Sequence, residues 1–107
     1  SMQAYAYGPS KAALNHLTRI LANELASKHI TVNAIAPGVF PSRMTKFVLQ
    51  DEASTALQRK QVPLNRLGEP EDMEGLAVFL SSPASAYITG NVICLDGGTA
   101  VKSPDII

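Results

Sequence analysis

Two apolar runs that are predicted to form buried β-strands constrain the fold of this chain more than any other feature. The first covers residues 30–36 and stops at Pro37 and Gly38, and the second covers residues 91–95 and stops at Asp96. Apolar, β-branched runs of this length, closed by proline or glycine, are typical of buried strands. Helical patterns separate the two runs, which predicts a crossover connection and a parallel sheet with helices on its faces.

Two further stretches have a helical period. The first predicted helix covers residues 10–28, and Pro9 before it fits only a first helical turn, because an interior proline loses a backbone hydrogen bond. The second covers residues 69–80, where Pro70 and the acids that follow it suit a helix start. The apolar stripe of the first helix consists of Leu14, Leu17, Leu21 and Leu25, with Ala13 and Ile20 beside them.

Residues 39–61 mix apolar and polar positions, and we expect one or two short helices between residues 45 and 57. The resulting order is helix, strand, long loop, helix, strand. Two parallel strands that are apolar on both faces would leave unpaired edges and uncovered surface. We therefore expect residues 1–107 to be the C-terminal portion of a larger single domain whose N-terminal half precedes them.

Composition narrows the class of protein. Nine basic and nine acidic residues cancel, so net charge favours neither nucleic acid nor an anionic membrane as a partner. The apolar runs are too short to span a bilayer, and a cytoplasmic location is expected. Cys94 is the only cysteine, which excludes an intrachain disulfide, and its apolar neighbours predict a small buried side chain.

A tyrosine and a lysine four residues apart, Tyr7 and Lys11, would project from one face of the first helix. A free phenol titrates near pH ~10, and a nearby ammonium favours the phenolate. Such a pair suits proton transfer to a carbonyl oxygen or from an alcohol. Both residue types are common on helices, so the pair taken alone favours a packed aromatic beside a solvated lysine over a catalytic site.

Three blocks in order carry a more specific signal. They are residues 7–13 (YGPSKAA), residues 30–38 (ITVNAIAPG) and residues 88–98 (ITGNVICLDGG). Through these blocks the chain resembles the short-chain dehydrogenase/reductase family along almost its whole length. The resemblance implies an α/β fold, the C-terminal part of a Rossmann-like doubly wound parallel sheet.

The resemblance also implies site residues. Tyr7 corresponds to the catalytic proton donor and acceptor, and Lys11 assists it and holds the ribose of the nicotinamide nucleotide. After Pro37 and Gly38, the family holds the nicotinamide carboxamide through backbone near position 40 and a hydroxyl at position 42. The residues expected to contact the cofactor are Tyr7, Lys11, Pro37, Gly38, Phe40 and Ser42.

Other parts of the family's machinery belong upstream of residue 1: the Gly-rich phosphate turn, an active-site asparagine and a serine. We therefore expect the 107-residue chain alone to be inactive. The resemblance implies an NAD(P)-dependent oxidoreductase that uses NADP, with NAD as the alternative. The implied substrate is a small carbonyl compound or alcohol, most similar to 3-oxoacyl thioesters. The expected assembly is a homodimer or homotetramer, or an association of this chain with the missing N-terminal half. The alternative is a noncatalytic oligomerisation or interaction piece of the same fold.

Several other polar residues are assigned no chemistry. His16 and His29 have no second ligand at metal spacing and are predicted to lie on the surface, so no metal site is expected. Arg66 is predicted to form an ion pair or a helix-start contact. Asp96 is predicted to be a turn and interface residue rather than an acid catalyst.

Overall fold

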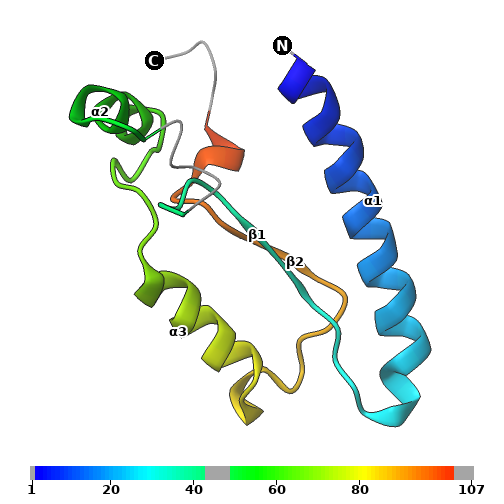
Figure 1. Cartoon of the computed structure of the whole chain (residues 1–107). Helices are drawn as coiled ribbons and strands as arrows, with labels where there is room; N and C mark the ends of the chain where they lie inside the picture. Colours follow the sequence, from blue (N-terminus) through cyan, green and yellow to red (C-terminus); the bar gives the residue numbers. More distant parts are fainter. Residues whose placement is uncertain (1, 43–48, 103–107) are drawn as a thin grey trace. The chain divides into compact units, whose positions relative to one another are not determined.

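The computed structural model describes the backbone of residues 2–42 and 49–102 and the side chains of residues 10–42 and 49–102. The chain divides into two compact units, residues 1–35 with 78–93 (unit 1) and residues 36–77 with 94–107 (unit 2). Among the described residues the order of the α-helices and strands is α1, β1, α2, α3 and β2, as Figure 1 shows. The predicted α/β class is confirmed.

Unit 1 begins with helix α1, Met2–Leu25, which continues into a short 3₁₀ helix, Ala26–Lys28. The end agrees with the prediction, whereas the predicted start at Pro9 or Ser10 is wrong, since α1 begins at Met2. Methionine, glutamine and alanine propagate helices well, and they precede Pro9 in the sequence. Pro9 is therefore interior to α1, although its nitrogen has no hydrogen to donate.

The face of α1 that packs within unit 1 is made of small residues. Thr18 and Ala22 are only 4% and 5% exposed, and a Cβ added at Gly90 would lie 3.5 Å from the Ala22 side chain. The larger apolar side chains are turned elsewhere: Leu17 is 53% exposed and Ile20 is 42% exposed. The predicted apolar stripe therefore lies on the surface of this chain, and small residues bring the segment near Gly90 close to the helix.

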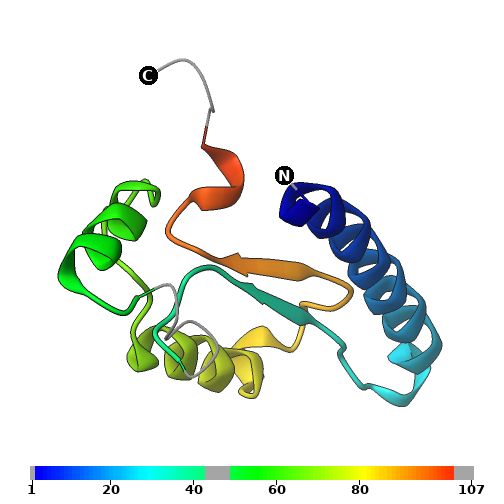
Figure 2. The same ribbon diagram turned by 45° about the horizontal axis from the view of Figure 1, so that its top comes forward.

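Strands β1, Ala34–Pro37, and β2, Val92–Leu95, lie side by side in one parallel sheet (Figure 2). In unit 1 the Ala34 N–H donates to the Asn91 carbonyl at 2.9 Å, and in unit 2 the Gly38 N–H donates to the Leu95 carbonyl at 2.9 Å. The predicted strand at residues 91–95 is confirmed to within one residue. The predicted strand at residues 30–36 is too long, because β1 begins only at Ala34.

Side chains and turn backbone replace strand pairing before β1. The Val32 N–H donates to the Thr89 hydroxyl at 3.0 Å, and the Val32 carbonyl accepts from the Gly90 N–H at 2.7 Å. Cys94 in β2 is exposed, so the prediction of a buried thiol is wrong. Side chains of a strand alternate between its faces, and the described residues leave the Cys94 position uncovered.

In unit 2, helix α2, Glu52–Lys60, follows the N-cap residue Asp51, whose carboxylate accepts the Ser54 N–H at 2.7 Å. Helix α2 begins inside residues 45–57, the segment predicted to hold one or two short helices, and continues past it to Lys60, while residues 43–48 lie outside the described residues. After α2 comes Val62, which is 5% exposed and packs against the turn at Gly97.

Helix α3, Pro70–Leu80, confirms the second predicted helix, with proline and two acids in its first turn. It is followed by two short 3₁₀ helices, Pro83–Ser85 before β2 and Thr99–Val101 after it. Within the ranges 2–42 and 49–102, none of the helices combines the length and apolarity that crossing a bilayer requires.

Candidate active site

The tyrosine and lysine singled out from the sequence both belong to α1. Tyr7 and Lys11 lie one helical turn apart on its backbone, which places residues i and i+4 on the same face. The side chain of Lys11 is partly buried, and that of Tyr7 lies outside the described side chains. Both residues belong to unit 1, whereas the expected cofactor-loop residues Pro37, Gly38, Phe40 and Ser42 belong to unit 2.

The loop after β1 begins with a close backbone approach. A Cβ added at Gly38 would lie 2.8 Å from both Cα and Cβ of Asp96, a separation that real side chains do not reach. Only glycine therefore fits beside Asp96 while its N–H bonds to the Leu95 carbonyl. Further along, the Phe40 side chain is partly buried and Ser42 is exposed.

The turn after β2 is organised by Asp96. Its carboxylate accepts the Gly98 N–H and the Ala100 N–H, each at 2.9 Å. Its carbonyl accepts the Thr99 hydroxyl at 2.9 Å, and Gly97 and Gly98 have φ values of 63° and 98°, which favour glycine. The prediction that Asp96 is a turn residue is confirmed.

Both loops follow the carboxyl ends of parallel strands, the edge where open α/β sheets bind their ligands. In unit 2 this edge has a cavity of about 120 Å³. Residues after both strands line it, Val39 and Phe40 after β1 and Asp96 and Gly97 after β2. Residues of the segment before α3 also line this cavity, namely Arg66, Leu67 and Gly68.

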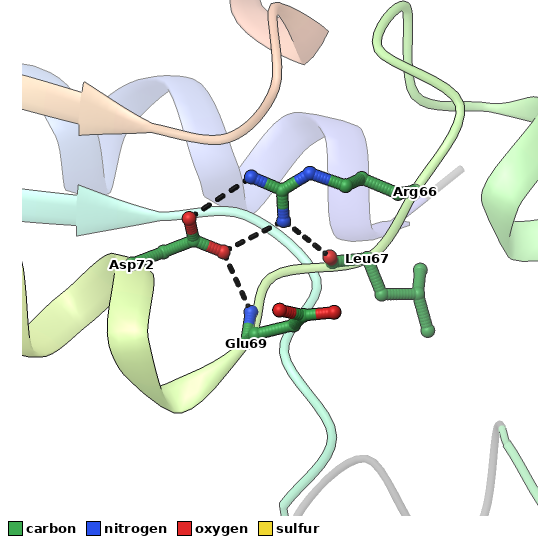
Figure 3. Close-up of polar contacts among 4 residues, drawn as sticks. All are labelled: Arg66, Leu67, Glu69 and Asp72. Atoms are coloured by element: carbon green, nitrogen blue, oxygen red, sulfur yellow. Dashed lines mark hydrogen bonds and ion pairs between the residues drawn. The ribbon is translucent and has the colours of Figure 1, made fainter.

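That segment contains a dense polar cluster, which Figure 3 shows. Arg66 makes a two-pronged ion pair with Asp72, Nη1 to Oδ2 at 2.7 Å and Nη2 to Oδ1 at 2.9 Å. Asp72 Oδ2 also accepts the Glu69 N–H at 2.8 Å, and Arg66 Nη1 donates to the Leu67 carbonyl at 3.1 Å. The prediction that Arg66 forms an ion pair at a helix start is confirmed.

These contacts shift the titration of both partners. The hydrogen bonds from Arg66, followed by that from the Glu69 N–H, lower the pKa of Asp72 to about 2. The hydrogen bonds to Asp72 and its negative charge raise the pKa of Arg66. The pair is therefore fully ionised across the physiological pH range.

Two polar residues of the matched blocks have structural roles that the sequence reasoning missed. Asn33 donates from Nδ2 to the Ile88 carbonyl at 3.0 Å, and its Oδ1 accepts the Asn91 N–H at 3.1 Å. Thr89 accepts the Val32 N–H through its hydroxyl. A polar residue inside the otherwise apolar run 30–36 is the sequence signal that marks Asn33.

The two histidines are exposed, as predicted. His29 has a left-handed φ of 59° and ends the 3₁₀ helix after α1 through its N–H bond to the Ala26 carbonyl. Among the described residues no group of three or more histidine, cysteine, aspartate or glutamate side chains is arranged to hold a metal ion.

Comparison with known proteins gives consistent matches. The family described as Enoyl-(Acyl carrier protein) reductase matches residues 1–100. The rhamnolipids biosynthesis 3-oxoacyl-(acyl-carrier-protein) reductase of Pseudomonas aeruginosa is 55% identical over 96 residues, which are 90% of this chain and 38% of that protein. The 5-keto-D-gluconate 5-reductase of Escherichia coli K12 is 47% identical over 95 residues, 89% of this chain and 37% of that protein.

A solved structure agrees with these relatives. The Pseudomonas aeruginosa RhlG/NADP active-site complex superposes with a TM-score of 0.84 at 53% identity, covering 92% of this chain and 38% of that chain. The chain thus spans less than two fifths of the length of each of these three proteins. On its sequence, its parallel α/β fold and these matches, the chain belongs to the short-chain dehydrogenase/reductase family.

Proposed function

We propose that residues 1–107 are the C-terminal, catalytic portion of an NADP-dependent reductase that converts the carbonyl group of a 3-oxoacyl thioester to an alcohol. The observation that carries the proposal is the 55% identity to the Pseudomonas aeruginosa 3-oxoacyl reductase along 90% of this chain. NADP is favoured over NAD because a similar solved structure is described as an NADP complex. The sugar-acid reductase at 47% identity makes a keto acid the competing substrate class.

In this proposal Tyr7 is the proton donor for the carbonyl oxygen. Its backbone position on α1 is one turn before Lys11, a spacing that assigns residues i and i+4 to the same face of a helix. The positive charge of Lys11 favours the phenolate that remains after proton transfer, and this makes a tyrosine usable near neutral pH. The chemistry that bound NADPH supplies is hydride donation.

The donor set of this chain suits a nicotinamide nucleotide. Lys11 offers an ammonium group with three hydrogens for ribose hydroxyls, and exposed Ser42 offers a hydroxyl for the carboxamide. Pro37 ends β1, and Gly38 and Phe40 lie in the loop that leads from β1 to Ser42. Gly38 allows that loop to begin directly beside the turn at Asp96.

The complete reductase tests the assignment of Tyr7. Tyr7→Phe removes only a hydroxyl, and we expect a loss of about 10²- to 10⁴-fold in kcat, the usual contribution of a general acid. Tyr87→Phe is the matched control, because Tyr87 is fully exposed and is not among the residues assigned to the site. NADPH consumption is followed with acetoacetyl-coenzyme A and with 5-keto-D-gluconate as substrates. Near-wild-type turnover by Tyr7→Phe would refute the role of Tyr7, and a higher kcat/KM for the keto acid would refute the thioester.

We also propose that the 107-residue chain binds dinucleotide very weakly when it is prepared alone. It contains no Gly-rich turn that could place a helix N-terminus on the pyrophosphate. Calorimetry with NADP should therefore give no saturable heat, and binding at micromolar concentration would contradict this expectation.

A role in assembly accompanies this function. Four large apolar residues of α1 are between 36% and 53% exposed, which fits association of this helix with a second copy in a homodimer or homotetramer, or with the N-terminal half of the domain. If the complete protein lacked reductase activity altogether, the same surface would support the alternative of a noncatalytic oligomerisation piece. The four residues are Leu14, Leu17, Ile20 and Leu21.

A further inference from the structure

The segment before α3 contacts the proposed cofactor loop that follows β1. The Gly68 N–H donates to the Val39 carbonyl at 2.9 Å, and the Phe40 ring occupies the space where a Cβ of residue 68 would stand. Gly68, Val39 and Phe40 also line the same cavity. The position of Gly68 therefore determines where Val39 and Phe40 can lie.

Gly68 itself lies in a stretch without regular secondary structure, so another interaction must fix it. The Arg66–Asp72 ion pair bridges this stretch, because its two ends lie on either side of Gly68. Two hydrogen bonds restrain the residues next to Gly68. Arg66 donates to the Leu67 carbonyl, and the Glu69 N–H donates to Asp72. The backbone on both sides of Gly68 is thus tied to one ion pair.

The geometry of this ion pair is suited to positioning. A guanidinium and a carboxylate joined by two parallel hydrogen bonds define an orientation as well as a distance, which a lysine cannot reproduce. Arg66 and Asp72 themselves line the cavity beside Phe40. Their side chains are partly exposed, 49% for Arg66 and 26% for Asp72, so the pair is ordered by its geometry rather than by burial.

We propose that Arg66 is a positioning residue for the nicotinamide nucleotide. Through Asp72 it fixes Gly68, and Gly68 in turn sets Val39 and Phe40 in the conformation that binds the cofactor. This inference rests on the proposed function, since the loop of Phe40 is assigned to the cofactor there. Arg66 acts through the loop, and no contact between Arg66 and substrate or cofactor is invoked.

Two measurements on the complete reductase test the proposal. Hydrogen exchange of the peptides that cover residues 38–42, measured without ligand, reports the order of the loop. Calorimetry with NADP reports the dissociation constant. For Arg66→Gln we expect faster exchange in this loop, a dissociation constant raised about three- to fivefold, and a kcat at saturating NADPH within about twofold of wild type.

Three further variants separate positioning from general destabilisation. Arg59→Gln is the matched control, because it removes an exposed ion pair with Glu52 at 2.9 Å in the same unit without touching the loop, and it should change neither measurement. Arg66→Lys keeps the charge but loses the two-pronged geometry, so it should recover only part of the affinity. Gly68→Ala leaves the ion pair intact but displaces the Phe40 ring, so it should raise the dissociation constant as Arg66→Gln does.

The outcomes are distinguishable. Unchanged exchange at residues 38–42 in Arg66→Gln would overturn the link between the ion pair and the loop. Faster exchange with an unchanged dissociation constant would overturn the role in cofactor binding. If the wild-type enzyme had no measurable affinity for NADP, the proposed function and this inference would both be overturned. That outcome differs from the other two, because wild type and every variant would then fail to bind NADP.

Discussion

The two glycines Gly38 and Gly75 should respond in opposite directions to the same substitution by alanine. A Cβ at Gly38 would lie 2.8 Å from Cα and Cβ of Asp96, and a Cβ at Gly75 would meet nothing within 4 Å. The φ of Gly38 is not in the left-handed region, so an alanine there is opposed by contact alone. Asp96 cannot easily move away from such a Cβ, because its carboxylate accepts hydrogen bonds from two N–H groups of the following turn.

The magnitudes follow from these environments. Forcing a methyl group into a packed backbone contact costs about 1–3 kcal/mol, so Gly38→Ala should lower stability by about 2 kcal/mol. Gly75 lies inside helix α3, where replacing glycine with alanine stabilises a helix by roughly 0.5–1 kcal/mol. For a domain of about 150–250 residues, 1 kcal/mol shifts Tm by about 2–4 °C. Gly38→Ala should therefore lower Tm by ~4–8 °C, and Gly75→Ala should raise it by ~1–4 °C.

Thermal unfolding of the complete protein, followed by circular dichroism, measures both shifts under one set of conditions. A Tm for Gly38→Ala equal to that of wild type would refute the close approach of Gly38 to Asp96. A lower Tm for Gly75→Ala would mean that the surface of α3 at this residue, open in the present structure, is covered in the complete protein.

Two further predictions concern polar contacts. Asn33→Ala removes the bonds to Ile88 and Asn91, and at ~1 kcal/mol for each bond it should lower Tm by about 4–8 °C, whereas a shift below about 1 °C would contradict a structural role for Asn33. Because the pKa of Asp72 is lowered from 3.8 to about 2, its ion pair stabilises the fold above pH ~4, and this stabilisation is lost as the pH falls toward 2. The stabilities of wild type and Asp72→Asn, measured by acid unfolding, should therefore differ above pH ~4 and converge toward pH 2. A constant difference in stability at every pH would contradict the assigned ion pair.

The sequence predicted those elements whose signals are local. Helix α3 begins at Pro70 and contains acids in its first turn, so its start is visible without any tertiary information. Strand β2 is bounded by Asn91 and Asp96, residue types that are uncommon in strands. Arg66 lies six residues before Asp72, the acid that it pairs with. The roles of Tyr7 and Lys11 remain predictions, supported by their spacing and by the family.

The features that sequence reasoning missed depend on partners far along the chain. The first strand was predicted to begin at residue 30, but the backbone of Val32 is bonded to Thr89 and Gly90, which no local pattern reveals. The start of α1 differs from the prediction because the helix-favouring residues before Pro9 extend the helix to Met2, although an interior proline opposes this. The exposure of Cys94 depends on what covers β2, and an apolar run alone does not determine this.

The link between Asn33 and the region of β2 also has a consequence for how the chain is made. Its partners Ile88 and Asn91 lie 55 and 58 positions later in the sequence. At a synthesis rate of about 5–20 residues per second, roughly 3–12 s pass between the synthesis of β1 and the synthesis of β2. During this time the edge of β1 that pairs with β2 has no partner strand. During this interval an apolar strand edge is open to pairing with other chains. The yield of folded protein should therefore depend on chaperone capacity and on translation speed between residues 38 and 88.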